Sequence, residues 1–235
     1  MQYRLLTAFR GLFAGVKYEH RKSTLGDYVA SFLYEDLVDL GHSQRLLDRV
    51  NSGRAALNTA NKTVGKSARR GDGTFGEVVP GVATVVVPDF TVPRARIASL
   101  EIGTETKILA KAMIKQIDRV INDLRAQSEE FKKCNPRAIC VALIGVNGSD
   151  YYESYEGTRS FRTDGKVQKH PAQESSQARQ RLLANVQDSY DELLILPFSA
   201  RNVPPYDFAW ENESELKVQY AAALSRISRE YDSRF

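Results

Sequence analysis

The spacing of hydrophobic residues predicts helices in the first quarter of the chain. Between residues 2 and 19, apolar side chains recur three and four positions apart, as on one face of an amphipathic helix; they are Leu5, Leu6, Phe9, Leu12, Phe13 and Val16. Residues 24–52 show the same period and are divided at Gly41 into a longer and a shorter helix. We therefore expect a helical N-terminal part over residues 1–60.

The pattern changes to that of strands in the middle of the chain. From Phe75 to Lys107 the sequence is rich in Val, Ile and Thr and is interrupted by Gly and Pro, which is typical of strands joined by turns. Helical spacing returns between Ile108 and Cys134. The continuous apolar run from Ala138 to Val146 then has the length of a strand that is covered on both faces.

The last third of the chain continues this alternation. We expect a helix from Pro171 to about Asp191, a strand at 193–202 and a closing helix at 212–235. Strands that alternate with helices favour an α/β (mixed α+β) fold in which helices cover a sheet. The sequence thus predicts a single domain over 1–235, with a central mixed sheet flanked by helices, its core at 75–200, and an N-terminal helical elaboration.

Composition narrows the class of protein only slightly. The shares of hydrophobic (42%) and charged (26%) residues are ordinary for a globular domain, and no apolar run approaches the roughly 18 residues that a membrane span needs. The two cysteines, Cys134 and Cys140, have no zinc-binding spacing and favour a reducing, cytoplasmic location. The net charge of +4 and the pI near 9.0 are compatible with nucleic-acid binding and do not require it.

One segment, from Lys62 to Gly73, is locally basic, and Asp72 is its single acid. Two interpretations remain open for it. The segment is either a solvated surface loop or a loop that contacts phosphate groups. In the second case the nucleic-acid-binding residues are Lys62, Lys66, Arg69 and Arg70.

Two acids and a lysine interrupt the most strand-like stretch of the chain. They are Glu101, Glu105 and Lys107. Burying an unpaired charge in a strand is costly unless a metal, a partner or water compensates it. The stretch is therefore either not a buried strand or a functional site.

The chain contains four places where an acid is followed two residues later by a lysine, beginning at Glu105, Glu130, Asp164 and Glu215. Residues i and i+2 point to the same face of a strand, whereas in a helix they do not face each other. Two of the four fall in predicted helices and the third in a polar loop. Geometry therefore selects Glu105 and Lys107 as the pair whose side chains converge.

Pro88-Asp89 stands sixteen residues before Glu105. Together with Glu105 and Lys107 it resembles the active-site motif of the PD-(D/E)xK, or restriction-endonuclease-like, nucleases. The long helix after the motif and the buried strand after that helix are similar to the core order of that family, so the resemblance covers residues 75–146. The alternative is an ion pair at a strand end with no catalytic role.

The resemblance implies a restriction-endonuclease-like core and a metal site. By this similarity Asp89, Glu105 and the main-chain carbonyl of Thr106 hold one or two Mg²⁺ ions, which Mn²⁺ can replace, and Lys107 orients or deprotonates the attacking water. Hard oxygen ligands of this kind suit Mg²⁺, and the ion neutralises charge on the phosphate while lowering the pKa of water.

The resemblance also predicts a register. If the chain reversed at Pro93, antiparallel pairing would place Asp89 opposite Ile97, eight residues from Glu105, which at about 3.3 Å per residue is too far for a shared metal. The reversal must therefore fall at residues 95–99, so that Asp89 lies opposite the neighbourhood of Glu105.

Several other residues are candidates for the same site. Glu77 is either the upstream acid that many family members add or an exposed turn residue, and Glu101 is a secondary residue that shares a face with Glu105 if the strand is regular. Gln116 is either a helix glutamine near the metal or DNA or a plain surface residue. Arg159 and Arg162 lie among tyrosines and are candidates for binding nucleic acid.

These residues predict a Mg²⁺-dependent endonuclease that cuts DNA, in restriction or anti-phage defence. It is expected to act as a homodimer or as a subunit of a larger defence complex, away from any membrane. The alternative is a catalytically inactive member of the same fold that binds nucleic acid or a partner protein.

Overall fold

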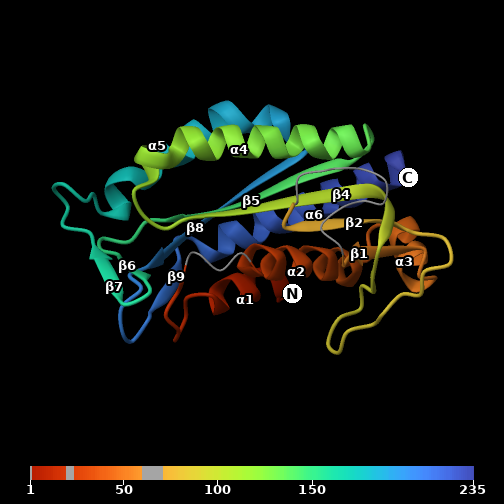
Figure 1. The fold of residues 1–235 in the computed structure, drawn as a ribbon, viewed down its shortest axis with the longest axis horizontal. Coiled ribbons are helices and arrows are strands. Elements are labelled where there is room, and N and C mark those ends of the chain that lie inside the picture. Colours follow the sequence, from red (N-terminus) through yellow and green to blue (C-terminus); the bar gives the residue numbers. More distant parts are fainter. Residues whose placement is uncertain (1, 20–23, 60–70) are drawn as a thin grey trace.

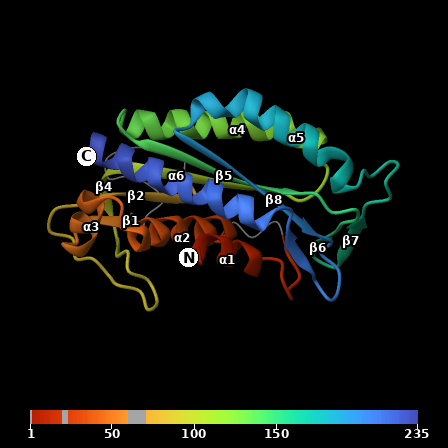
Figure 2. The same cartoon turned by 180° about the vertical axis from the view of Figure 1, so that it is seen from behind.

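The computed structural model describes residues 2–19, 24–59 and 71–235, which form a three-layered mixed α/β fold. A seven-stranded sheet lies between two layers of helices (Figures 1 and 2). Helices α4 (Met113–Cys134) and α5 (Pro171–Val186) cover one face, and α1 (Arg4–Gly11), α2 (Thr24–Leu40) and α6 (Glu213–Arg234) cover the other. The predicted mixed sheet flanked by helices is thus present.

The N-terminal part contains the three predicted helices and one strand that the pattern does not reveal. Helix α1 ends at Gly11, well before residue 19, and α3 (Gln44–Asn51) follows α2. Strand β1 (Ala55–Asn58) then enters the sheet beside β2 (Gly73–Val78). At four residues, β1 is too short to show a period.

The sheet has the strand order β3-β1-β2-β4-β5-β8-β9. Strands β4 (Ile97–Leu109) and β5 (Ile139–Asn147) are parallel and are joined by α4, and β8 (Glu192–Ala200) is parallel to β5. Strand β2 is antiparallel to β4, while the short strands β3 (Arg94–Ala95) and β9 (Phe208–Trp210) lie at the two edges. Every residue of β5 is buried, because helices cover both of its faces.

A separate two-stranded hairpin follows β5. It consists of β6 (Glu153–Glu156) and β7 (Arg159–Arg162), and it lies at the end of the molecule where β4 and β5 finish (Figure 1). Neither strand was predicted, because both are short and polar. The 3₁₀ turn Gln187–Ser189 (η1) connects α5 to β8.

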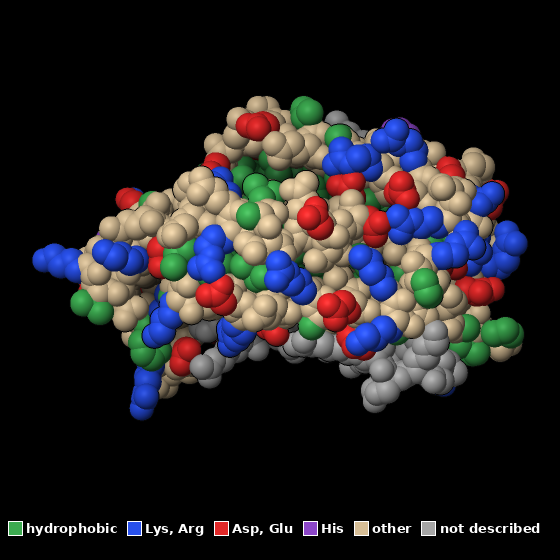
Figure 3. All heavy atoms as spheres, turned by 90° about the horizontal axis from the view of Figure 1, so that it is seen from above, with side chains coloured by type: hydrophobic (Ala, Val, Ile, Leu, Met, Phe, Trp, Pro, Cys, Tyr) green, Lys and Arg blue, Asp and Glu red, His purple; other side chains and the backbone are tan. Residues whose placement is uncertain are grey.

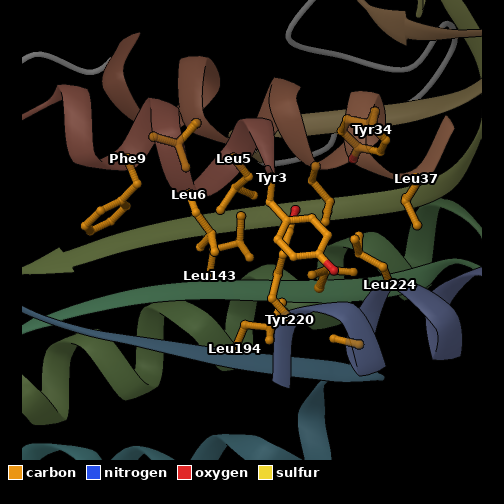
Figure 4. Packing of buried hydrophobic residues seen from close by; sticks show 14 of the residues in the cluster. Tyr3, Leu5, Leu6, Phe9, Tyr34, Leu37, Leu143, Leu194, Tyr220 and Leu224 are labelled. Atoms are coloured by element: carbon orange, nitrogen blue, oxygen red, sulfur yellow. The ribbon is translucent and has the colours of Figure 1, made fainter. Parts of the chain in front are cut away.

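The larger core packs α1, α2 and α6 against the sheet. Figure 4 shows Leu5 and Leu6 of α1 pointing toward Leu143 of β5, and the Phe9 ring packs over Gly145 of the same strand. A buried carboxylate organises this layer: Asp36 accepts hydrogen bonds from the main-chain N–H groups of Arg4 and Leu5 and from the hydroxyl of Tyr220. Asp36 therefore accepts hydrogen bonds from N–H groups at the start of α1 that have no partner within the helix, and the N-cap residue of α1 forms no side-chain cap.

None of the described helices is both long enough and apolar enough to cross a membrane.

Candidate active site

Glu105 and Lys107 converge on one face of β4, as their spacing predicts. The Lys107 ammonium donates a hydrogen bond to a Glu105 carboxylate oxygen. Glu105 is buried, whereas the side chain of Lys107 is 31% exposed and reaches solvent. The pair lies beside Ala142 and Ile144 of β5, two residues of the core that packs against α4. Both charges therefore lie on the side of the sheet that α4 covers.

The predicted register of Asp89 is wrong. The chain reverses between Val85 and Arg94, which form an antiparallel bridge, so Asp89 lies in the loop between them with a left-handed φ of 67°. Its main-chain carbonyl accepts a hydrogen bond from Arg4 at 3.3 Å, and the residue lines a groove outside α1 and α2. Helix α2 covers the face of the sheet opposite to that of Glu105. Asp89 is therefore not brought near Glu105.

A different acid, Asp72, occupies the position beside Glu105. Gly73 pairs with Thr104 in the antiparallel ladder of β2 and β4, so the preceding residue, Asp72, is level with Glu105. One Asp72 carboxylate oxygen accepts a hydrogen bond from the Thr106 main-chain N–H at 2.8 Å. The N–H and C=O of one residue in a strand point the same way, so the Thr106 carbonyl is also directed toward Asp72.

The residues on either side of Asp72 are glycines, and they lie in close contact with α2 and α4. A Cβ at Gly73 would lie 2.9 Å from the Ala30 Cβ of α2, and a Cβ at Gly71 would collide with the Phe131 ring of α4. On α2 itself, a Cβ at Gly26 would lie 2.6 Å from the Asp72 carboxyl carbon. No larger residue fits at these three positions without displacing a neighbour.

A cavity of about 460 Å³ opens beside these residues, between the end of β4 and the start of α4. Asp72, Thr106 and Lys107 line it. Gln116 of α4 also lines it, and its side-chain amide donates a hydrogen bond to the Lys111 carbonyl at 2.9 Å. Of the two interpretations of Gln116, the structure favours a position in the site over a plain surface position.

Charge on the cavity wall is mixed. Lys107, Lys111 and Arg119 lie on it together with Asp72 and Asp123. Burial lowers the pKa of the Lys111 ammonium, and the nearby charge of Glu156 opposes this shift.

The two carboxylates of the site act on a common neighbour. Burial raises the pKa of Tyr190, and the negative charges of Glu105, Cys140 and Asp72 raise it further. The Tyr190 hydroxyl donates a hydrogen bond to the Leu124 carbonyl of α4 at 2.8 Å. Asp72 and Glu105 are therefore both close enough to Tyr190 to affect the pKa of its hydroxyl.

The prediction that Glu77 belongs to this site is wrong. Glu77 is exposed on β2 and pairs with Ser99. Ser99 precedes Glu105 by six residues along β4, a separation of about 20 Å at the rise of a strand. Glu77 is exposed, as the alternative interpretation holds, but it lies in a strand and not in a turn.

The prediction that Glu101 shares a face with Glu105 is also wrong, because β4 is irregular. Phe75 of β2 pairs with Ile102, and the next residue, Gly76, pairs with Leu100, so Glu101 is an extra residue in the ladder. The bulge turns its carboxylate to the opposite face of the sheet. There Glu101 accepts hydrogen bonds from Arg49 of α3 and Tyr231 of α6.

The remaining predicted residues fall in two groups. Arg159 and Arg162 lie on the exposed strand β7, and Arg162 forms an ion pair with Glu153 at 3.1 Å. The other four, Lys62, Lys66, Arg69 and Arg70, lie outside the described residues.

The oxygen atoms of the site suit a hard divalent cation. Asp72 and Glu105 supply carboxylates and Thr106 supplies a carbonyl, which are the donor types that Mg²⁺ prefers. Among the residues that the structure describes, no group of three or more metal-ligating side chains occurs. A metal here would therefore depend on two carboxylates and the main chain, and would keep several waters, as Mg²⁺ usually does.

The sequence contains a signal for Asp72 that is separate from the Pro-Asp motif. Asp72 is the single acid of a basic segment, is flanked by Gly71 and Gly73, and directly precedes a strand. Glycines on both sides of an acid mark a close approach of the backbone to other elements.

Comparisons with known proteins identify no relative of this chain. No family model, no curated protein and no solved structure matches it.

Proposed function

We propose that this chain is a Mg²⁺-dependent nuclease that hydrolyses phosphodiester bonds of DNA, with a restriction-endonuclease-like core. The observation that carries the proposal is the hydrogen bond from the Thr106 N–H to Asp72, because it fixes a second carboxylate beside the Glu105–Lys107 pair. The topology supports it as well. An antiparallel pair (β2 and β4) followed by a helix and a parallel strand (α4 and β5) is the element order expected of that core.

The proposed metal ligands are the carboxylates of Asp72 and Glu105 and the carbonyl of Thr106. A divalent cation held by these ligands would supply Lewis-acid stabilisation of the phosphate and would lower the pKa of a coordinated water. In this proposal Asp72, which follows Gly71 and not a proline, takes the role that the resemblance assigns to Asp89.

The side chains around the ligands have separate roles in this proposal. Lys107 reaches from the buried Glu105 into the cavity, where it orients the attacking water or, as the neutral amine, accepts its proton. Gln116 donates hydrogen bonds to a phosphate oxygen or to that water. The hydrogen bond from Thr106 keeps Asp72 in position before the substrate arrives, which is the preorganisation that efficient catalysis requires.

Incubation of the purified protein with labelled single-stranded and duplex DNA in Mg²⁺, Mn²⁺ or EDTA tests the proposal. Cleavage is expected with either cation and not with EDTA. The Glu105→Gln variant should be inactive, and Glu215→Gln, in an exposed position on α6, should cleave like the wild type. Cleavage that survives in EDTA or in Glu105→Gln would show that the activity belongs to another site or to a contaminant.

A further inference from the structure

An aromatic side chain stands exposed at the mouth of the candidate site. Phe161 of β7 is 43% exposed, and none of the ring–ring contacts among the described residues involves it. A phenylalanine ring left partly in water forgoes much of the free energy that burial would contribute. Phe161 therefore does not act as a core residue.

The hairpin that carries Phe161 forms part of the cavity wall. Tyr152 and Ser154 line the cavity, and Ser154 is the cross-strand partner of Phe161. Lys111, which also lines the cavity, places its ammonium 5.3 Å from the centre of the Phe161 ring and donates a hydrogen bond to the Phe161 carbonyl at 3.4 Å. These contacts hold the ring next to the space that Lys107 and Asp72 also line.

The surroundings of the ring are suited to a polyanion. Arg159 and Arg162 are exposed on the same strand, and Lys111 lies beneath the ring. Figure 3 shows Lys and Arg side chains projecting at the end of the molecule that carries β6 and β7. Aromatic rings interleaved with basic side chains are the arrangement by which proteins bind single-stranded nucleic acids, with bases stacked on rings and phosphates beside the charges.

The size of the cavity and the exposure of the ring point to an unpaired strand. A volume of about 460 Å³ is that of a pocket for a small-molecule-sized ligand, which is sufficient for one or two nucleotides and too small for a duplex. In a duplex, moreover, each base is stacked on its neighbours and offers no face to a side chain until it is unstacked.

We propose that Phe161 is a stacking platform for an unpaired base next to the scissile phosphate, so that the substrate is a single strand or a frayed end. This inference rests on the proposed nuclease function. Lys111 is the positioning residue for the ring, and Arg159 and Arg162 contact flanking phosphates.

The test measures binding separately from cleavage. Fluorescence anisotropy in EDTA compares a short labelled DNA strand, the RNA strand of the same sequence, and the DNA duplex. Phe161→Ala should lower the affinity for the single strands about tenfold, which corresponds to about 1.4 kcal/mol, and should leave duplex binding unchanged. Phe161→Leu, which keeps an apolar side chain, should show most of the same loss. Tyr28→Ala is the matched control, because Tyr28 is an aromatic residue of similar exposure (47%) on α2.

A second readout reports stacking directly. A strand containing 2-aminopurine should lose fluorescence on binding the wild type and keep it on binding Phe161→Ala, because stacking on a ring quenches the base. Equal binding of single strands by wild type and Phe161→Ala, or equal losses in Phe161→Ala and Tyr28→Ala, would overturn the platform. If Phe161-dependent binding is found while no DNA is cleaved, the stacking role of Phe161 is supported and the proposed nuclease function is contradicted.

Discussion

The Asp72 carboxylate and the Thr106 main-chain N–H are joined by a hydrogen bond of 2.8 Å. This contact links the start of β2 to the segment of β4 that carries Glu105 and Lys107. It identifies Asp72 as the second acid of the candidate site and leads to the first prediction.

Replacing Asp72 by Asn should abolish cleavage, and replacing Asp89 by Asn should not. Asparagine keeps the size of the side chain and removes the charge that a divalent cation needs, so we expect Asp72→Asn to reduce kcat by about 100-fold or more. Asp89 lies in a loop outside α2 and serves as the matched control. Single-turnover cleavage rates measure both effects, and the reverse ranking of the two variants would exclude Asp72 as the ligand.

Removal of the Lys107 amine should separate chemistry from binding. Lys107→Ala is expected to lower kcat by about 100-fold and to leave the affinity for single-stranded DNA within about threefold of wild type, because the proposal assigns most of the phosphate contacts to other basic residues. Lys107→Arg, which keeps the charge and loses the titratable amine, should remain impaired. Full activity of Lys107→Arg would show that only the positive charge matters.

Gly26 provides a test of how closely the position of Asp72 is defined. Alanine favours a helix over glycine by about 1 kcal/mol, so Gly26→Ala should maintain or raise the free energy of unfolding. Its methyl group, however, would lie 2.6 Å from the Asp72 carboxyl carbon and displace that side chain. A displacement of about 1 Å can cost about 100-fold in rate, so activity should fall while stability does not.

The control for this variant is Gly11→Ala on α1, where an added Cβ meets nothing within 4 Å. Urea unfolding and cleavage assays on both variants check the prediction. Retained activity in Gly26→Ala would mean that the carboxylate of Asp72 need not stay where the structure has it.

Glu101 should make the stability of the fold depend on pH. Burial raises the pKa of Glu101, and the charge of Glu77 adds to this effect, although hydrogen bonds from Tyr231 and Arg49 oppose it. A raised folded-state pKa means that the folded protein holds its proton to a higher pH than the unfolded chain does. The free energy of unfolding contributed by Glu101 therefore falls as pH rises from its unfolded pKa of about 4.3 to the higher folded pKa.

Urea titrations of wild type and Glu101→Gln over pH 4 to 8 measure this effect. The stability of wild type relative to Glu101→Gln should decline with increasing pH across that window, and the variant should show the flatter profile. Parallel profiles of the two proteins would contradict the raised pKa.

The parts of the fold that depend on local pattern are predictable from the sequence. Helical spacing identifies α4, a continuous apolar run identifies β5, and the two-residue period of a strand brings Glu105 and Lys107 together. Each of these inferences uses residues that are close in sequence, where geometry is fixed by the element itself.

The errors concern residues whose neighbours are set by tertiary structure. The motif resemblance points to Asp89 and requires a reversal at residues 95–99, whereas residues 79–96 leave β2, cross to the edge of the sheet and return through β3. The position of Asp72 beside Glu105 depends on the β2–β4 register, which no local pattern reveals. The hairpin β6–β7 is not predictable because exposed polar strands have no hydrophobic period.

The extra residue at Glu101 has a consequence for how the sequence of β4 must be counted. A residue added to a strand exchanges the side chains of its two faces unless a bulge absorbs it. Here the bulge does so: Leu100 packs in the core beneath α4 and Ile102 in the core of α1, α2 and α6, as neighbours in a regular strand would. Deleting Glu101 would therefore leave Glu105 and Lys107 facing α4. The strand thus separates two tasks: the residues that alternate hold the candidate site on one face, while the extra residue joins α3 and α6 on the other.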